Sequence, residues 1–347
     1  MNTRLAAVAA LSLSLAACAS LQPPVDAPNW RRDAPDPVGR LKLDRAVEDR
    51  LLALDPESVS AEDVRDTLSK VPAPRVILLH GGVYPVHLAM TSFAHFMIGM
   101  GYPAEQIRHP SDGNWSHSPY EASERVAGMI AWSYEHDGLR PMMVGHSQGG
   151  MQVVKVLHDL AGTFAKELPV WNPVTDSAER RTAIVDPYTR AERPVIGTQV
   201  SFASAVGAGG PSGVLPNQWA VIGRLREVPD TAVQFNGYFL GIDWFTMSLA
   251  ELADRYHNAS GKVLVRNVVL PAGYLHVSVP VSHHLPDNPE YKRYVDAYRA
   301  TTEKPDESQM PGTYSDNIYY AADNWASIKK HWVLEAQRLA RARRSRG

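Results

Sequence analysis

Cysteine is nearly absent from this sequence. Cys18 is the single cysteine among 347 residues, so no internal disulfide can form and one hydrophobic core must stabilise the fold. Hydrophobic residues make up 44% of the chain, an ordinary content for a globular protein with such a core. Because no other thiol exists, a cysteine nucleophile and a thiolate metal site are excluded from the body of the chain.

Other features that define protein classes are missing as well. The formal net charge is −2, so there is no basic surplus of the kind that binds nucleic acid. We find no His-Glu-x-x-His pattern, no carboxylate–histidine cluster at ligand spacing, no G-x-G-x-x-G after a strand and no phosphate-binding loop. The sequence therefore predicts no metal, no other cofactor and no nucleic-acid partner.

The first seventeen residues have the pattern of a secretory signal peptide. A charged start at residues 1–4 precedes an apolar stretch over residues 5–17, which is too short to span a bilayer. Leu15-Ala16-Ala17-Cys18 resembles the lipobox of bacterial lipoproteins, which implies cleavage after Ala17 and acylation of Cys18. Ala19 follows the cysteine, and in that family this implies the outer membrane, facing the periplasm or the cell surface. The alternative is an ordinary signal peptide cleaved nearby, with Cys18 incidental.

Proline dominates the next segment, residues 18–40. This composition predicts an extended, semi-stiff tether that holds a domain of residues 41–347 away from a membrane. Two short helices are predicted to follow. Apolar spacing predicts the first over residues 41–54, and the capping box Ser60-Ala61-Glu62-Asp63 opens the second, which extends to about residue 70.

Strands and helices then alternate along the chain. Continuous apolar runs predict buried parallel strands, and apolar residues at helical spacing predict helices between them. The alternation predicts an α/β fold, a mostly parallel central sheet with helices on both faces. Loop-rich, cap-like insertions are predicted at about residues 165–195 and 207–230. The expected strands cover residues 76–79, 141–144, 200–206, 233–242 and 263–270, with a weak one at Ile107, and the expected helices 85–100, 120–136, 247–256 and 323–341.

The most informative motif is Gly145-His146-Ser147-Gln148-Gly149-Gly150. An apolar strand precedes it and a helical pattern follows, which is the context that a G-x-S-x-G nucleophile elbow requires. A serine on so sharp a turn takes a strained backbone conformation, and its neighbours must be small so that strand and helix can approach. The motif predicts Ser147 as a nucleophile; the alternative is a glycine-rich loop that only turns the chain.

His80-Gly81-Gly82 after the first strand, together with this motif, resembles the α/β-hydrolase superfamily, most closely its bacterial lipases and esterases. The resemblance covers about residues 74–300. The usual antiparallel strand pair before the first parallel strand is not evident, which implies a reduced sheet. The superfamily supplies its triad in the order serine, acid, histidine. For the oxyanion hole the resemblance implies the backbone N–H groups of Gln148 and Gly82.

The acid is expected just past a later strand. Asp243 follows the apolar run that ends at Ile242 and precedes a predicted helix, so it is the preferred candidate, although it could instead cap that helix. Asp230 lies before its strand and Asp186 lies in an insertion, and both rank lower.

The base is expected beyond the last strand, where three histidines occur. His283 lies in a segment that resembles the His-x-Leu-Pro…Pro-Glu loop of the family and is the preferred base. His284 and His276 are the alternatives, and His276 follows the strand more directly. His80 and His146 are expected to shape turns.

Together these residues predict a serine hydrolase that cleaves carboxylic esters, small or lipid, through an acyl-enzyme and without a cofactor. An acyltransferase with the same triad is one alternative. A non-catalytic lipoprotein that keeps the fold as a scaffold is another, since fold alone does not fix function.

Overall fold

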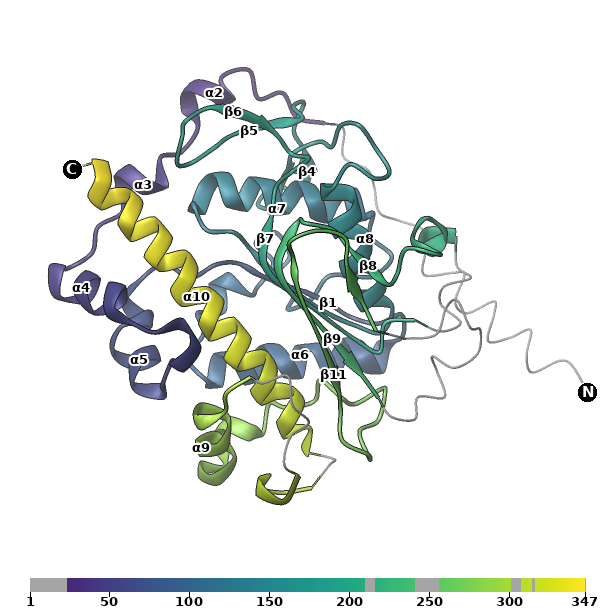
Figure 1. Ribbon diagram of the computed structural model, residues 1–347. Coiled ribbons are helices and arrows are strands. Elements are labelled where there is room, and N and C mark those ends of the chain that lie inside the picture. The colour runs from purple at the N-terminus through teal and green to yellow at the C-terminus, as the bar shows by residue number, and fades with distance from the viewer. Residues whose placement is uncertain (1–23, 210–215, 241–255, 301–306, 314–315, 347) are drawn as a thin grey trace, which may run out of the picture.

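A parallel sheet of five strands forms the centre of the molecule (Figure 1). The computed structural model describes residues 24–209, 216–240, 256–300, 307–313 and 316–346. The strand order is β1-β2-β7-β9-β11, and every neighbouring pair is parallel. The predicted mostly parallel α/β sheet is confirmed. The strands are β1 (Val76–Leu79), β2 (Met142–His146), β7 (Val200–Val206), β9 (Ala232–Phe239) and β11 (Leu264–Val269).

Helices cover both faces of the sheet because strands such as β1 are apolar on both sides. In β1, Val76 and Leu78 enter one hydrophobic cluster, whereas Ile77 and Leu79 enter a second one on the opposite face. α7 (Ser123–Asp137) and α8 (Gln148–Leu160) contribute to the second cluster. α6 (Tyr84–Gly99) and the long α10 (Ile318–Arg346) contribute to the first.

The N-terminal helices pack on the side of α10. They are α4 (Arg45–Ala53), the 3₁₀ turn η1 (Pro56–Ser58), α5 (Ala61–Asp66) and the 3₁₀ turn η2 (Leu68–Lys70). The predicted capping box is confirmed, because Ser60 and Asp63 exchange side-chain and backbone hydrogen bonds at the start of α5. α5 ends before Thr67, and the chain then forms the 3₁₀ turn η2. The predicted helix to residue 70 is therefore α-helical only in its first part.

The prediction of an extended tether over residues 18–40 is wrong from Pro24 onward. Residues 24–40, which we call the N-terminal strap, lie on the domain and contain α2 (Trp30–Asp33) and α3 (Pro37–Arg40). Val25 donates to the carbonyl of Ala178 at 2.8 Å, and Val38 is fully buried. Proline does not prevent this packing, because Pro37 occupies the first turn of α3, where its missing N–H costs nothing.

The insertions contain short strands that the sequence did not predict. In the first, β3 (Trp171–Asn172) pairs antiparallel with β4 (Ser177–Ala178), and β5 (Ala183–Val185) with β6 (Glu192–Pro194). The described part of the second includes the 3₁₀ helix η5 (Pro216–Val221) and β8 (Glu227–Val228). β8 pairs with β10 (Asn258–Ala259).

Other elements differ from expectation. Ile107 ends the 3₁₀ turn η3 (Ala104–Gln106) and forms no strand, whereas His117 pairs with the end of β1 instead. α9 (Pro289–Ala297) was not predicted as a separate helix, and α10 is longer at both ends than the predicted helix over 323–341. Two further 3₁₀ turns are η6 (Leu285–Asp287) and η7 (Glu307–Gln309). The predicted helix 247–256 lies almost entirely outside the described residues. Among the described helices, none combines the length and the apolarity needed to cross a membrane.

Candidate active site

Ser147 lies on a strained turn between β2 and α8. Its backbone φ of 57° and ψ of −123° fall in a region that non-glycine residues rarely adopt. The Ser147 N–H donates to the carbonyl of Val206 at 2.8 Å, which fixes the turn against the neighbouring strand β7. The side chain is partly exposed while its neighbours His146 and Gln148 are buried. The predicted strand, tight turn and helix are confirmed, and they present the hydroxyl at the carboxyl edge of the sheet.

Glycine is sterically required around this turn. A Cβ on Gly149 would lie 2.5 Å from the carbonyl oxygen of His80, and a Cβ on Gly145 would lie 2.7 Å from the Val153 side chain. Both contacts are too short for real Cβ atoms, and in the first the obstacle is backbone, which cannot rotate away. The glycines therefore allow α8 to start directly beneath the loop that follows β1.

The imidazole that contacts Ser147 belongs to His276. Its Nε2 lies 2.8 Å from the Ser147 Oγ, which is hydrogen-bonding distance for a nucleophile and its base. His276 follows β11 by seven residues and is buried, with 9% of its surface exposed. A serine hydroxyl and a histidine that are 129 residues apart in sequence are thus joined at the same sheet edge.

His146 supports the loop that carries His276. The Nε2 of His146 lies 2.6 Å from the backbone carbonyl of His276, and because a carbonyl only accepts, this nitrogen carries the proton. The His146 side chain is fully buried, and the centroids of the two imidazole rings are 5.3 Å apart. His146 therefore does more than shape the turn, because it ties the end of the nucleophile strand to the base.

The prediction that His283 is the imidazole beside the serine is wrong in this structure. His283 Nδ1 lies 2.8 Å from the Ser92 Oγ in α6, and the backbone N–H of His283 donates to the same oxygen. The alternative residue His284 lies at the start of η6, with its Nε2 3.7 Å from an Asp316 oxygen. The loop around His283 turns toward α6 and α9, away from β2, because Ser92 binds its backbone.

The loop after β1 lies against the nucleophile. A Cβ on Gly81 would lie 3.0 Å from the Ser147 Cβ, and a Cβ on Gly82 would overlap the Gln148 side-chain oxygen. His80 Nδ1 lies 2.7 Å from the carbonyl of Gly81, and the Tyr120 hydroxyl donates to the carbonyl of Gly82 at 3.0 Å. The two predicted oxyanion residues, Gly82 and Gln148, are therefore neighbours in space.

These hydrogen bonds fix the orientation of the peptide planes in the loop. No cis peptide occurs in the described residues, so the Gly82 N–H points away from the Gly81 carbonyl that His80 holds. Burial lowers the pKa of His80, so its ring is neutral near pH 7 and donates through Nδ1. Gln148 begins α8, where the backbone N–H groups of the first turn have no acceptor within the helix.

Glu121 follows Tyr120, whose hydroxyl contacts the loop after β1, and it carries a charge close to the site. Its carboxylate lies 3.2 Å from His117 Nδ1 and 3.7 Å from Arg125. Burial alone would raise the pKa of Glu121, but the hydrogen bond from His117, the charge of Arg125 and the backbone N–H of Ser118 outweigh it and lower the pKa to about 2. Glu121 therefore remains ionised and fixes the turn next to Tyr120.

The predicted acid, Asp243, lies outside the described residues, as does Cys18. The two lower-ranked carboxylates have other partners. Asp230 accepts from the backbone N–H of Val263 at 2.8 Å, just before β11, and Asp186 accepts from the backbone of Tyr188 and Thr189 in the β5–β6 turn. Neither lies at the carboxyl edge of the sheet. In the part of the chain that is described, no three histidine or carboxylate side chains are grouped to hold a metal ion.

Comparison with known proteins assigns no family to this chain. No protein-family model matches it, and no curated protein matches it in sequence. The chemistry of the site therefore rests on Ser147, His276 and the loops around them.

Proposed function

We propose that this protein is a serine hydrolase that cleaves carboxylic esters through an acyl-enzyme. The observation that carries the proposal is the 2.8 Å distance between the Ser147 Oγ and His276 Nε2, with the serine held on a strained turn. An activated serine needs a base within hydrogen-bonding reach, and His276 fills that role in place of His283.

In this mechanism His276 takes the Ser147 proton as the oxygen attacks the ester carbonyl. The protonated imidazole then donates to the leaving alcohol, and an acyl group remains on Ser147. Water, deprotonated by the same imidazole, releases the acid. His146 holds the His276 backbone during both steps.

The developing negative charge is assigned to the amides of Gln148 and Gly82. Gln148 lies at the N-terminus of a helix of thirteen residues, where the helix dipole favours negative charge. An amide aimed at an oxyanion is typically worth about 10²- to 10³-fold in rate.

The chain order of the site supports an α/β-hydrolase fold as part of the proposal. Ser147 follows β2 and His276 follows β11, and the segment that leads to Asp243 leaves β9, which lies between β7 and β11 in the sheet. Asp243 is therefore proposed as the group that orients His276.

Exposed apolar side chains next to the catalytic loops support an ester with an apolar part. Leu275, which precedes His276, is 63% exposed, and Val83 and Tyr84, which follow Gly82, are 60% and 72% exposed. Apolar side chains at the mouth of a site are typical of pockets that bind apolar ligands. The lipobox-like segment extends the proposal to an acylated Cys18 and the bacterial outer membrane.

A fluorophosphonate probe tests the proposal, because it reacts with an activated serine and remains attached. We expect labelling of the folded protein at Ser147, no labelling of Ser147→Ala, and turnover of p-nitrophenyl esters that is lost in the same variant. A folded protein that neither binds the probe nor hydrolyses esters would contradict the proposal and favour the non-catalytic scaffold.

A further inference from the structure

Arginine is strongly concentrated on one face of the molecule. Three segments form this face, which we call the arginine face: the N-terminal strap (24–40), residues 179–193 and residues 338–346. They contain twelve arginines and six carboxylates, although the whole chain has slightly more acidic than basic residues. Nine of these arginines are exposed, whereas only three of the carboxylates are. These three segments therefore carry a basic surplus, although Arg344 is paired with Glu48 and Asp49 of the adjacent α4.

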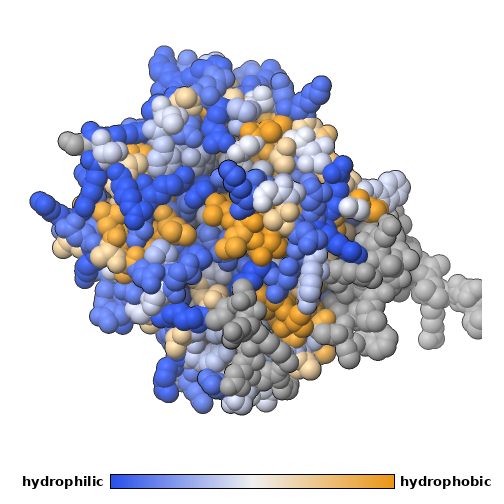
Figure 2. All heavy atoms as spheres, viewed as in Figure 1, coloured by the Kyte–Doolittle hydropathy of each residue, from blue (hydrophilic) through white to orange (hydrophobic). Residues whose placement is uncertain are grey.

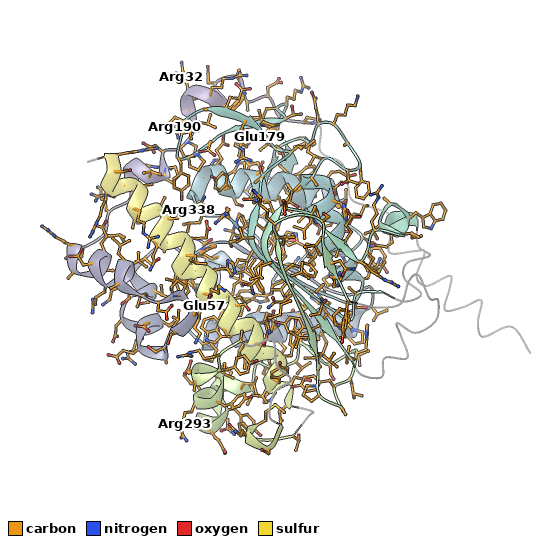
Figure 3. The ribbon with its side chains drawn as sticks, viewed as in Figure 1. Arg32, Glu57, Glu179, Arg190, Arg293 and Arg338 are labelled. Atoms are coloured by element: carbon orange, nitrogen blue, oxygen red, sulfur yellow. The ribbon has the colours of Figure 1, made fainter. Side chains whose placement is uncertain are left out.

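Direct contacts join the three segments into one surface. Arg346, at the end of α10, pairs with Asp36 of the strap at 2.9 Å and donates to the carbonyl of Tyr188. Arg190 donates to the carbonyl of Ala34, and Arg31 pairs with Glu192 at 2.5 Å. Figure 3 shows Arg32 and Arg190 at one end of the molecule and Arg293 of α9 at the other. Hydrophilic side chains dominate the end that carries α2 (Figure 2).

The described chain starts on this same face. Pro24 begins the strap, and Val25 pairs with the backbone of Ala178 and Arg180. Only five residues lie between Cys18 and Pro24, so Cys18 could lie at most about 20 Å from this point even on a fully extended chain. A docked strap therefore permits a much closer approach to the lipid than a free tether over residues 18–40.

We propose that the arginine face is the membrane-docking surface of this protein and that its partner is a bilayer with anionic headgroups. The proposal rests on the acylation of Cys18 proposed above. The anchor holds the domain near the bilayer, and the arginines select the face that contacts it, because basic side chains near an anionic surface are attracted over about a Debye length.

This orientation separates the catalytic site from the bilayer. The first turn of α10 adjoins the His276 loop, since Asn317 donates to the carbonyl of Val281 and Tyr319 donates to the Tyr274 hydroxyl. Arg346 ends the same helix on the arginine face, and a helix of 29 residues is about 43 Å long. The docked domain therefore presents Ser147 to the aqueous phase, and its ester substrate arrives from that side.

The single cysteine makes the test direct, because an acylated Cys18 leaves no other thiol. A fluorophore is attached to the full acylated chain through Ala191→Cys, in the exposed β5–β6 turn, or through the matched exposed position Ala297→Cys in α9. Both proteins are incorporated into phosphatidylcholine vesicles with or without phosphatidylglycerol, and each vesicle carries a quencher on its lipid headgroups.

We expect the fluorophore at position 191 to be quenched and the fluorophore at position 297 not to be quenched. The quenching should occur only in vesicles that contain phosphatidylglycerol, and added salt should reverse it. The double variant Arg32→Gln/Arg343→Gln should reduce the docked fraction about fivefold for each charge. The charge-conserving variant Arg32→Lys/Arg343→Lys and the distant variant Arg293→Gln should leave the docked fraction unchanged. An acylated protein whose two labels are quenched equally overturns the docking face and leaves the anchor intact. If the full chain carries no acyl group and sediments with neither kind of vesicle, both the anchor and the docking face are overturned. Ester hydrolysis by Ser147 is measured in a separate assay, so failure of the docking proposal and failure of the proposed enzyme activity are distinguishable.

Discussion

His146 offers the most specific test of how the base is held. Its Nε2 donates to the His276 carbonyl at 2.6 Å from a fully buried position. Leucine has a similar volume but no donor, so His146→Leu removes this hydrogen bond without leaving a large cavity. A typical hydrogen bond stabilises the arrangement that it joins by about 0.5–1.5 kcal/mol. At its upper limit this loss reduces the population of aligned His276 by about tenfold.

We therefore expect kcat for ester hydrolysis to fall by about tenfold in His146→Leu, with little change in KM, because substrate binding does not involve this bond. Glutamine reaches to nearly the same point with an N–H donor, so His146→Gln should recover most of kcat. Thermal denaturation of both variants controls for general loss of stability. Wild-type kcat in a folded His146→Leu protein, or equal losses in both variants, would refute a positioning role.

Three other features give measurable expectations. Gly149→Ala forces a Cβ into the backbone of the loop after β1, so we expect a loss of about 1–3 kcal/mol in the free energy of unfolding, measured by urea denaturation. Glu135→Gln removes the 2.7 Å carboxylate partner of Arg181, which is 5% exposed but keeps Glu179 at 2.6 Å, and should cost about 1–3 kcal/mol in the same assay. The folded pKa of Glu121 is lowered to about 2, partly by its hydrogen bond from His117, so this carboxylate stabilises the fold above its unfolded pKa of about 4.5. That contribution, up to about 3 kcal/mol, should be lost as the pH falls from about 4.5 to 2 and should be absent in Glu121→Gln.

Elements that carry a strong local signal were predicted correctly from the sequence. Strands such as β1 and β7 are continuous apolar runs, and a buried parallel strand needs nothing else to be recognised. The turn at Ser147 was predicted for a similar reason, because three glycines around one serine have few explanations other than close approach of backbone. In both cases the determinant lies within a few consecutive residues.

Features that depend on distant contacts were predicted less well. Proline content indicated a free tether, but Trp30 stacks against the Arg181 guanidinium at 4.7 Å and Val38 is buried in the core, and both interactions involve partners far along the chain. Similarly, His276 and His283 both follow β11, and the resemblance of one loop to a family pattern favoured His283. The shorter connection from β11 to His276 was the better signal, because a short loop keeps its side chains at the edge where the strand ends.

The central claim is that Ser147 and His276 act together, and exchanging histidines one at a time tests it most directly. Ester turnover and fluorophosphonate labelling are compared in His276→Ala and His283→Ala, two variants from the same loop region. The geometry predicts that His276→Ala lowers kcat by at least about 10³-fold, while His283→Ala stays near the wild-type rate. Full activity in His276→Ala, or loss of activity in His283→Ala alone, would contradict it.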